Sequence, residues 1–336
     1  TSLIIMNILV KYNNCIYCNS KKLVKIEKQN HFKNFYVKSI ISDLKLKNKD
    51  IKKIKVFKCS NCKLIQNNPW FSEEISRKIY SNIYGQHNRG WTNLLNFLKK
   101  GITPDHGKLF DILSKSIKIK KYAEFNSPFM GIMINFFSKE YKNSKYFYKN
   151  LLNYIINYLS SRQVAGKSKR LQKLSFEKSK KIFKRLHKLK NKNLISKRVE
   201  KYLFTDNSSL CWGQNDNYKS VNSKSFATEM FDLKILDLGE KDNKIKIDLF
   251  GIFHTLDHTF NPNKVLNYAL NVSRYVIVYC HVNESLSKQH LFSVTKEFLN
   301  YLNKQNIYTL NLTNMIDKKY RSPELYFLCS KKKIYI

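Results

Sequence analysis

The sequence predicts an α/β protein in which a Rossmann-like sheet follows a small cysteine-rich module and is interrupted by a basic helical insertion. Three observations predict this organisation. Two Cys-x-x-Cys pairs stand near the start of the chain, short apolar runs alternate with helical patterns over residues 119–336, and residues 139–200 combine many lysines with apolar residues at helical spacing. Alternating strands and helices are typical of a doubly wound α/β domain.

The two cysteine pairs are Cys15 with Cys18 and Cys59 with Cys62. This spacing lets one tight turn direct two thiolates at one ion, and four thiolates close a tetrahedral Zn²⁺ site. The sequence therefore predicts a zinc ribbon over residues 1–70, with an extra hairpin or loop between the pairs. The alternatives are two unrelated thiol clusters, or disulfides in a secreted protein. No export signal precedes the pairs, which favours zinc and a cytoplasmic location.

The chain has 336 residues, 62 of them Lys or Arg, and a formal net charge of +38. Such an excess of positive charge is typical of nucleic-acid binding. Lys, Asn, Ile, Tyr and Phe are all abundant while Gly and Pro are scarce, which also fits an AT-rich coding sequence. Arginine, the cation best suited to planar phosphate recognition, is the minority. Nucleic acid thus stays the less favoured partner, and no apolar run of transmembrane length is present.

Residues 71–118 are predicted to form an aromatic, helical linker, with helices over 88–100 and Gly107–Ser116. The α/β pattern then opens with a strand at Lys121–Phe125 and a helix at 132–138. We expect the insertion at 139–200 to be a helical hairpin that packs by its apolar stripe, or a lid. Further strands are predicted at 202–205, 233–238, 245–253, 275–280, 307–312 and 325–330, and helices at 263–272 (with Pro262 first and Asn261 as cap) and 286–304.

The segment from Asp248 to His258, followed by Asn261-Pro262, carries the most specific signal. It resembles the "D-x-x-x-x-x-x-H-x-L-E-H-x-x-[DN]-P" stretch of class I methyltransferases that use S-adenosylmethionine, with Asp257 in place of the usual Glu. In that family the segment is the fourth strand and the loop beside the methyl donor. Ligands of open α/β sheets do bind beyond the carboxyl ends of strands. The resemblance implies a Rossmann-like methyltransferase sheet over residues 119–336.

The same resemblance implies donor-binding residues. The family's first loop is usually "E-x-G-x-x-x-G", and this chain keeps the acid and the last glycine but replaces the first glycine by Asn, which tolerates positive φ. The candidate donor-binding residues are Glu124, Asn126, Gly131, Asp206, His254 and Asp257.

The whole chain also resembles the sugar C-methyltransferases, which carry an N-terminal ribbon and act on nucleotide-linked ketosugars. Gln289-His290 looks like that family's late "E/Q-H" segment, whose His is thought to deprotonate the carbon that is methylated. A base with a pKa near 7 suits that step, and a helix beginning at 286 would keep the imidazole neutral. Tyr84, His87 and His254 are further catalytic candidates. For each of these residues a purely structural role is the alternative.

We therefore expect a methyltransferase that uses S-adenosylmethionine and zinc and acts on a small, nucleotide-linked sugar or related metabolite. The alternatives are an RNA methyltransferase, or a degenerate methyltransferase fold that only binds its ligand.

Overall fold

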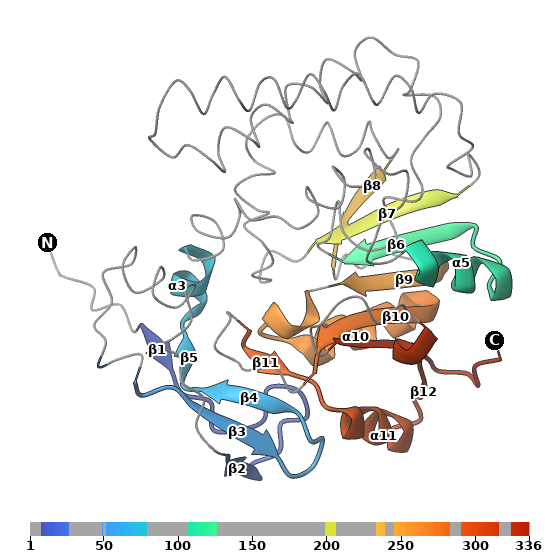
Figure 1. The fold of residues 1–336 in the computed structure, drawn as a ribbon. Helices are drawn as coiled ribbons and strands as arrows, with labels where there is room; N and C mark the ends of the chain where they lie inside the picture. The colour runs from blue at the N-terminus through green and yellow to red at the C-terminus, as the bar shows by residue number, and fades with distance from the viewer. Residues whose placement is uncertain are drawn as a thin grey trace, which may run out of the picture.

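The computed structural model describes residues 8–26, 49, 52–78, 107–125, 199–205, 233–238, 245–253, 255–282, 290–315 and 324–335. Within these ranges the chain forms one large sheet and two small ones (Figure 1). The helices predicted at 88–100 and 132–138, and almost all of the insertion at 139–200, lie outside the described residues. Among the helices that are described, none is long and apolar enough to cross a bilayer.

The large sheet has seven strands in the order β12-β13-β10-β9-β6-β7-β8. Its parallel strands are β6 (Lys121–Phe125), β7 (Glu200–Thr205), β8 (Leu233–Asp237), β9 (Ile247–Phe253) and β10 (Ser273–His281). The last two are β12 (Tyr308–Asn311) and β13 (Glu324–Ser330), and β13 runs antiparallel to both β10 and β12. The chain therefore winds outward in both directions from β6 and β9, which makes the carboxyl ends of these strands the expected ligand edge.

Burial explains why these segments are strands. Almost every residue of β9 and β10 is buried, and runs of Val, Ile, Phe and Tyr suit a strand that is covered on both faces. The helix α10 (Pro262–Val272) packs on β10, and α5 (Gly107–Ser116) precedes β6. The seven predicted strands are confirmed with ends shifted by a few residues. Asn261 occupies the predicted N-cap position of α10, but its side chain makes no capping hydrogen bond.

The small sheets belong to the cysteine-rich module. The first has the order β11-β4-β3-β2, in which β2 (Leu23–Lys25), β3 (Lys55–Cys59) and β4 (Ile65–Asn68) form an antiparallel ribbon. The second pairs β1 (Leu9–Val10) with β5 (Trp70–Phe71), just ahead of helix α3 (Glu73–Lys78). The fourth strand of the ribbon sheet, β11 (Phe292–Ser293), comes from the opposite end of the chain and pairs with β4.

This pairing overturns one prediction. The helix expected at 286–304 does not span that range, because the strand β11 precedes a shorter helix, α11 (Lys296–Lys304). Phe292 and Ser293 bond to Gln66 and Ile65 of the ribbon, a partner more than 200 residues away that no local pattern reveals. Tertiary hydrogen bonding has overridden helical periodicity here.

The ribbon and the large sheet share one hydrophobic core, which includes Cys15 and Trp70 at one end and Leu266 and Phe327 at the other. Tyr17 of the ribbon packs edge-on against Phe298 of α11, with ring centroids 4.8 Å apart. Figure 1 shows the ribbon, in blue, beside the orange C-terminal half of the large sheet, with β11 next to β4. The two parts are therefore one packed unit within the described residues.

Candidate functional site

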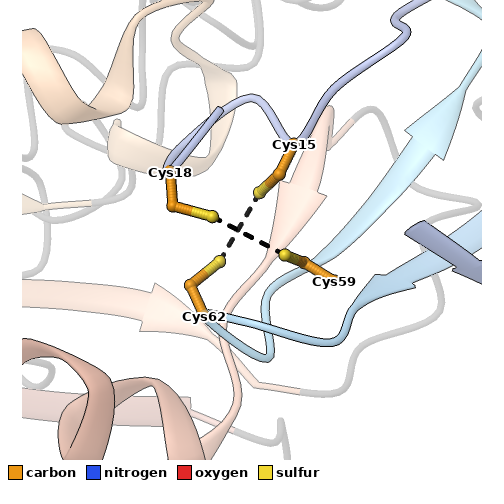
Figure 2. Close-up of side chains that lie close together, drawn as sticks. All are labelled: Cys15, Cys18, Cys59 and Cys62. Carbon is orange, nitrogen blue, oxygen red and sulfur yellow. Dashed lines mark hydrogen bonds between the residues drawn. The ribbon is translucent and has the colours of Figure 1, made fainter. Parts of the chain in front are cut away.

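The first candidate site is the cluster of Cys15, Cys18, Cys59 and Cys62, whose sulfurs point toward one centre (Figure 2). The Sγ atoms of Cys15 and Cys62 lie 3.5 Å apart, and those of Cys18 and Cys59 lie 3.6 Å apart. A tetrahedral Zn²⁺ with Zn–S bonds of about 2.3 Å would hold its sulfurs about 3.8 Å apart. The donor set and its spacing therefore fit a thiolate-bound metal ion.

The two Cys-x-x-Cys turns have the same backbone. In each, the residue after the second cysteine donates its N–H to the carbonyl of the first cysteine, as in Asn19 to Cys15 and Lys63 to Cys59, both at 3.0 Å. Asn19 and Lys63 both adopt positive φ, 56° and 65°. Asn accepts this left-handed conformation readily and Lys does so at a cost. The identical turns aim both sulfur pairs at the same point.

One of the four thiols, Cys15, is polarised toward the thiolate. A hydrogen bond from the Cys62 side chain, helped by N–H groups of residues 17 and 18, lowers the pKa of Cys15 to about 5. The same hydrogen bond and burial raise the pKa of Cys62, which therefore keeps the shared proton. Backbone N–H groups that point at sulfur stabilise the charged form that metals bind.

The second candidate site is a buried cluster of one carboxylate and three imidazoles at the carboxyl ends of β9 and β10, made by Asp257, His258, His281 and His290. Asp257 and His258 belong to η7 (Leu256–His258), the short turn that follows β9. His281 is the last residue of β10, and His290 stands just before β11. The adjacency of β9 and β10 places Asp257 beside His281, and the pairing of β11 with β4 positions the segment that carries His290, at the edge where ligands of α/β sheets bind.

The imidazoles surround Asp257. Its Oδ2 lies 2.9 Å from Nδ1 of His281 and 3.6 Å from Nε2 of His290, and its Oδ1 lies 3.9 Å from Nε2 of His258. The His290 ring also lies tilted against the His281 and His258 rings, with centroids 4.4 and 4.6 Å away. All four residues are at most 5% exposed. Three imidazoles and a carboxylate are thus held in contact away from bulk water.

Asp257 is the charged member of this cluster. Its complete burial acts to raise the pKa of the carboxyl, but His290, His258 and the hydrogen bond from His281 together hold that pKa below its usual range. Buried carboxylates of this kind are found where a protein arranges charge for chemistry or metal binding.

Hydrogen bonds from the ribbon hold in place the segment that carries His290 of the Asp257 cluster. Asn67 of β4, fully buried, donates its side-chain amide to the carbonyl of His290 at 2.9 Å and its backbone N–H to the carbonyl of Leu291 at 3.0 Å. The Leu291 N–H in turn donates to the carbonyl of Asp257 at 3.1 Å. Asn67 therefore connects the ribbon, which carries the cysteine cluster, to the segment that carries His290 of the Asp257 cluster.

Glu124 lies near the end of β6 and is fully buried. It accepts a hydrogen bond of 2.6 Å from the hydroxyl of Tyr122, two residues earlier on the same face. Gly251, its partner on β9, leaves the room for this pair, because a Cβ there would lie 2.6 Å from the Tyr122 hydroxyl and 2.5 Å from the Phe253 ring. Glu124 thus stands at the β6–β9 boundary, where the winding direction of the sheet changes.

The predicted site residues fall into three groups. The four cysteines lie together, and Asp257 and His290 lie together. Glu124 is on β6, the strand beside β9, and accepts a hydrogen bond from Tyr122. The remaining candidates lie outside the described residues: Tyr84, His87, Asn126, Gly131, Asp206 and His254. The catalytic roles assigned to the histidines and Tyr84 stay predictions.

His281 is a member of the Asp257 cluster that sequence reasoning missed. Its signal was its position, as the residue that ends the strongest β-branched strand of the chain, on the ligand edge. The helix N-terminus that was expected to keep His290 neutral is absent from that position, because α11 begins at Lys296.

No protein-family model matches this chain, and no curated protein matches it either. The chain is similar in fold to several solved structures. One is the plantazolicin methyltransferase BpumL in complex with SAH, with 7% identity, a TM-score of 0.37 and coverage of 76% of this chain and 94% of that one. Another is the magnesium protoporphyrin IX methyltransferase ChlM from Synechocystis PCC 6803, with 6% identity, a TM-score of 0.33 and coverage of 77% and 99%.

A third is the 16S rRNA methylase ArmA, with 10% identity, a TM-score of 0.30 and coverage of 77% of this chain and 90% of that one. The class that the sheet itself defines is a Rossmann-like α/β protein, with a reversed strand, β13, between β10 and β12.

Proposed function

We propose that this protein transfers a methyl group from S-adenosylmethionine to a small acceptor. The observation that carries the proposal is the position of the Asp257 cluster, at the carboxyl ends of β9 and β10 in a sheet that winds outward from β6. The segment that resembles the methyltransferase motif ends in this cluster. A sulfonium donor is cationic, and a ligand edge that offers a buried carboxylate, Glu124, suits it.

The proposed acceptor is polar and anionic, such as a nucleotide-linked sugar. A groove of about 600 Å³ lies between residues 11–19 of the ribbon and the start of α10. Its lining includes two lysines, Lys11 and Lys264, and no carboxylate among the described residues. It also includes the asparagines Asn13, Asn14, Asn19, Asn261, Asn263 and Asn267. Amides that both donate and accept, beside positive charge, suit sugar hydroxyls and phosphates.

We propose further that the four cysteines bind one structural Zn²⁺. The close sulfur spacing and the lowered pKa of the Cys15 thiol support this, and a Cys₄ set leaves no open position for catalysis. The ion's contribution would be to the folding of the ribbon.

Calorimetric titration with S-adenosylhomocysteine tests the donor site. We expect saturable one-to-one binding, and a loss of affinity of about tenfold or more in Glu124→Gln, since a buried hydrogen bond to a charged group contributes about 1.5–3 kcal/mol. Glu200→Gln is a matched control. Glu200 accepts a comparable hydrogen bond from Tyr202, two residues away, but stands at the opposite end of β7 and is exposed.

Equal affinity in Glu124→Gln and Glu200→Gln would remove Glu124 from the donor site. Failure of the wild-type chain to bind either S-adenosylmethionine or its product would refute methyl transfer and leave a ligand-binding fold. Tight RNA binding that persists at physiological salt would move the acceptor from a small molecule to RNA.

A further inference from the structure

We propose that Asp257, His258 and His290 bind a divalent transition-metal ion, at a site separate from the four cysteines. One potential ligand atom from each residue lies within 4.8 Å of the others. Bonds of about 2.0–2.2 Å from imidazole nitrogen or carboxylate oxygen place tetrahedral ligands about 3.4 Å apart. Nε2 of His290 lies 3.6 Å from Oδ2 of Asp257, and Nε2 of His258 lies 3.9 Å from Oδ1, so the three side chains need only a small adjustment to meet at one ion.

The burial of the Asp257 carboxylate and the bonding of its two oxygens support a bound metal ion. Asp257 is 0% exposed, and its Oδ1 accepts no hydrogen bond from any described residue. A buried carboxylate oxygen without a donor is costly, and coordination is one of the few ways to satisfy it. Oδ1 also faces His258, so the unsatisfied oxygen is aimed into the cluster.

His281 is not one of the three proposed ligands, but it contacts the carboxylate of the ligand Asp257. Its Nδ1 lies 2.9 Å from Oδ2 of Asp257, which fixes the rotation of the carboxylate. Hydrogen bonds of this kind to a ligating carboxylate are typical of metal sites and raise their affinity. The Leu291 N–H, which donates to the carbonyl of Asp257, and Asn67, which donates to that of His290, fix the backbones of two ligands.

The donor set indicates the class of metal. Two imidazoles and one carboxylate suit Zn²⁺, Fe²⁺ or Co²⁺, and three protein ligands leave positions for water or a substrate oxygen. Mg²⁺ and Ca²⁺ prefer sites made of oxygen alone. A nitrogen that ligates a metal ion cannot also take up a proton. As a metal ligand, His290 therefore does not act as the general base predicted from the sequence.

The test counts metal ions in the full-length chain. After equilibration with Zn²⁺ and removal of free ion, elemental analysis should give two ions per chain in the wild type and one in Asp257→Asn. His258→Gln should also give one, and it serves as a second variant should Asp257→Asn not fold. His281→Gln, which keeps all three ligands, should retain the second ion with an affinity about 10–100-fold weaker.

Titration with Co²⁺ separates the two sites in the unaltered protein. The cysteine site should show intense thiolate-to-metal charge-transfer absorption, and the second equivalent should add only weak visible bands. Saturation at one equivalent, all of it thiolate-bound, would overturn the proposal, as would a second ion that survives in both Asp257→Asn and His258→Gln. Neither readout needs the methyl donor, so failure here is distinct from failure of methyl transfer.

Discussion

The cysteine cluster and the Asp257 cluster are both largely buried, but the chain assembles them in different ways. The four cysteines come from two turns of four residues each, and the same N–H to carbonyl bond closes both turns. The Asp257 cluster comes from a turn after β9, the end of β10 and the residue before β11. No local spacing connects these positions. Short-range geometry builds the first cluster, and sheet topology builds the second.

The difference teaches where each cluster is vulnerable. A Cys-x-x-Cys turn is specified by its own residues, and the proposed metal ion would join the two turns. The Asp257 cluster needs the large sheet and also the ribbon, because Asn67 and β4 hold the segment that carries His290. Damage to the cysteine cluster should therefore reach the Asp257 cluster, whereas damage to the Asp257 cluster should leave the cysteines intact.

Metal removal should have the largest effect. Structural zinc contributes about 10–16 kcal/mol of binding free energy in isolated zinc fingers, so Cys59→Ser or a strong chelator should lower the free energy of unfolding by at least about 4 kcal/mol. Because ribbon and sheet share one core, we expect one cooperative loss rather than the melting of the ribbon alone. Denaturant unfolding followed by circular dichroism, with zinc counted in parallel, measures it.

Cys329→Ser is the control for that experiment. Cys329 is equally buried but lies on β13, and its thiol donates to the carbonyl of Val276 at 3.5 Å, a bond that serine can keep. It should retain zinc and its loss of stability should be smaller. Chelation without any change in stability would contradict a structural metal.

Gly251→Ala should cost about 1–3 kcal/mol of folding free energy through overpacking. The added Cβ would stand 2.5 Å from the Phe253 ring and 2.6 Å from the Tyr122 hydroxyl. Denaturant unfolding measures the loss. The double variant of Gly251→Ala with Tyr122→Phe lacks the hydroxyl that the added Cβ would approach. It should therefore lose less folding free energy than the sum of the two single variants. Additive losses would mean that the strand shifts instead of clashing.

Asn67→Ala should cost about 1–2 kcal/mol, because it leaves the buried carbonyl of His290 without its donor. Asn68→Ala is matched, since Asn68 bonds Tyr12 inside the ribbon and not the Asp257 segment. Hydrogen exchange at residues 290–293 should accelerate in Asn67→Ala and stay near wild type in Asn68→Ala. Equal protection in both variants would show that the two clusters are not coupled through Asn67.

The smallest effect is expected at the second cysteine turn. Lys63 holds a φ of 65°, where Asn19 holds 56° in the first turn. Asn tolerates this conformation better than Lys, so Lys63→Asn should stabilise the fold by about 0.5 kcal/mol. Thermal unfolding of the zinc-loaded protein detects the change, and Lys58→Asn, on the neighbouring strand β3, is the control. A loss of stability in Lys63→Asn would mean that the lysine side chain matters more than its backbone.

The sequence by itself determined the features that local chemistry specifies. Two Cys-x-x-Cys pairs predicted one cysteine cluster, and the structure places all four sulfurs together. The strands Lys121–Phe125 and Glu324–Ser330 could be found because short apolar runs with aromatic residues are typical of buried strands. Asp257 was singled out because its segment resembles a methyltransferase motif, and the segment follows a predicted strand whose carboxyl end would face ligands.

The tertiary structure alone decided which distant segments meet. The helical pattern after residue 286 predicted a helix through His290, yet Phe292 and Ser293 pair with the ribbon instead. His281 joins Asp257 because β10 lies beside β9, an adjacency that periodicity cannot reveal. Local spacing is encoded within a few residues. A contact between residues 67 and 290 depends instead on the whole sheet having formed first, so no sequence pattern predicts it.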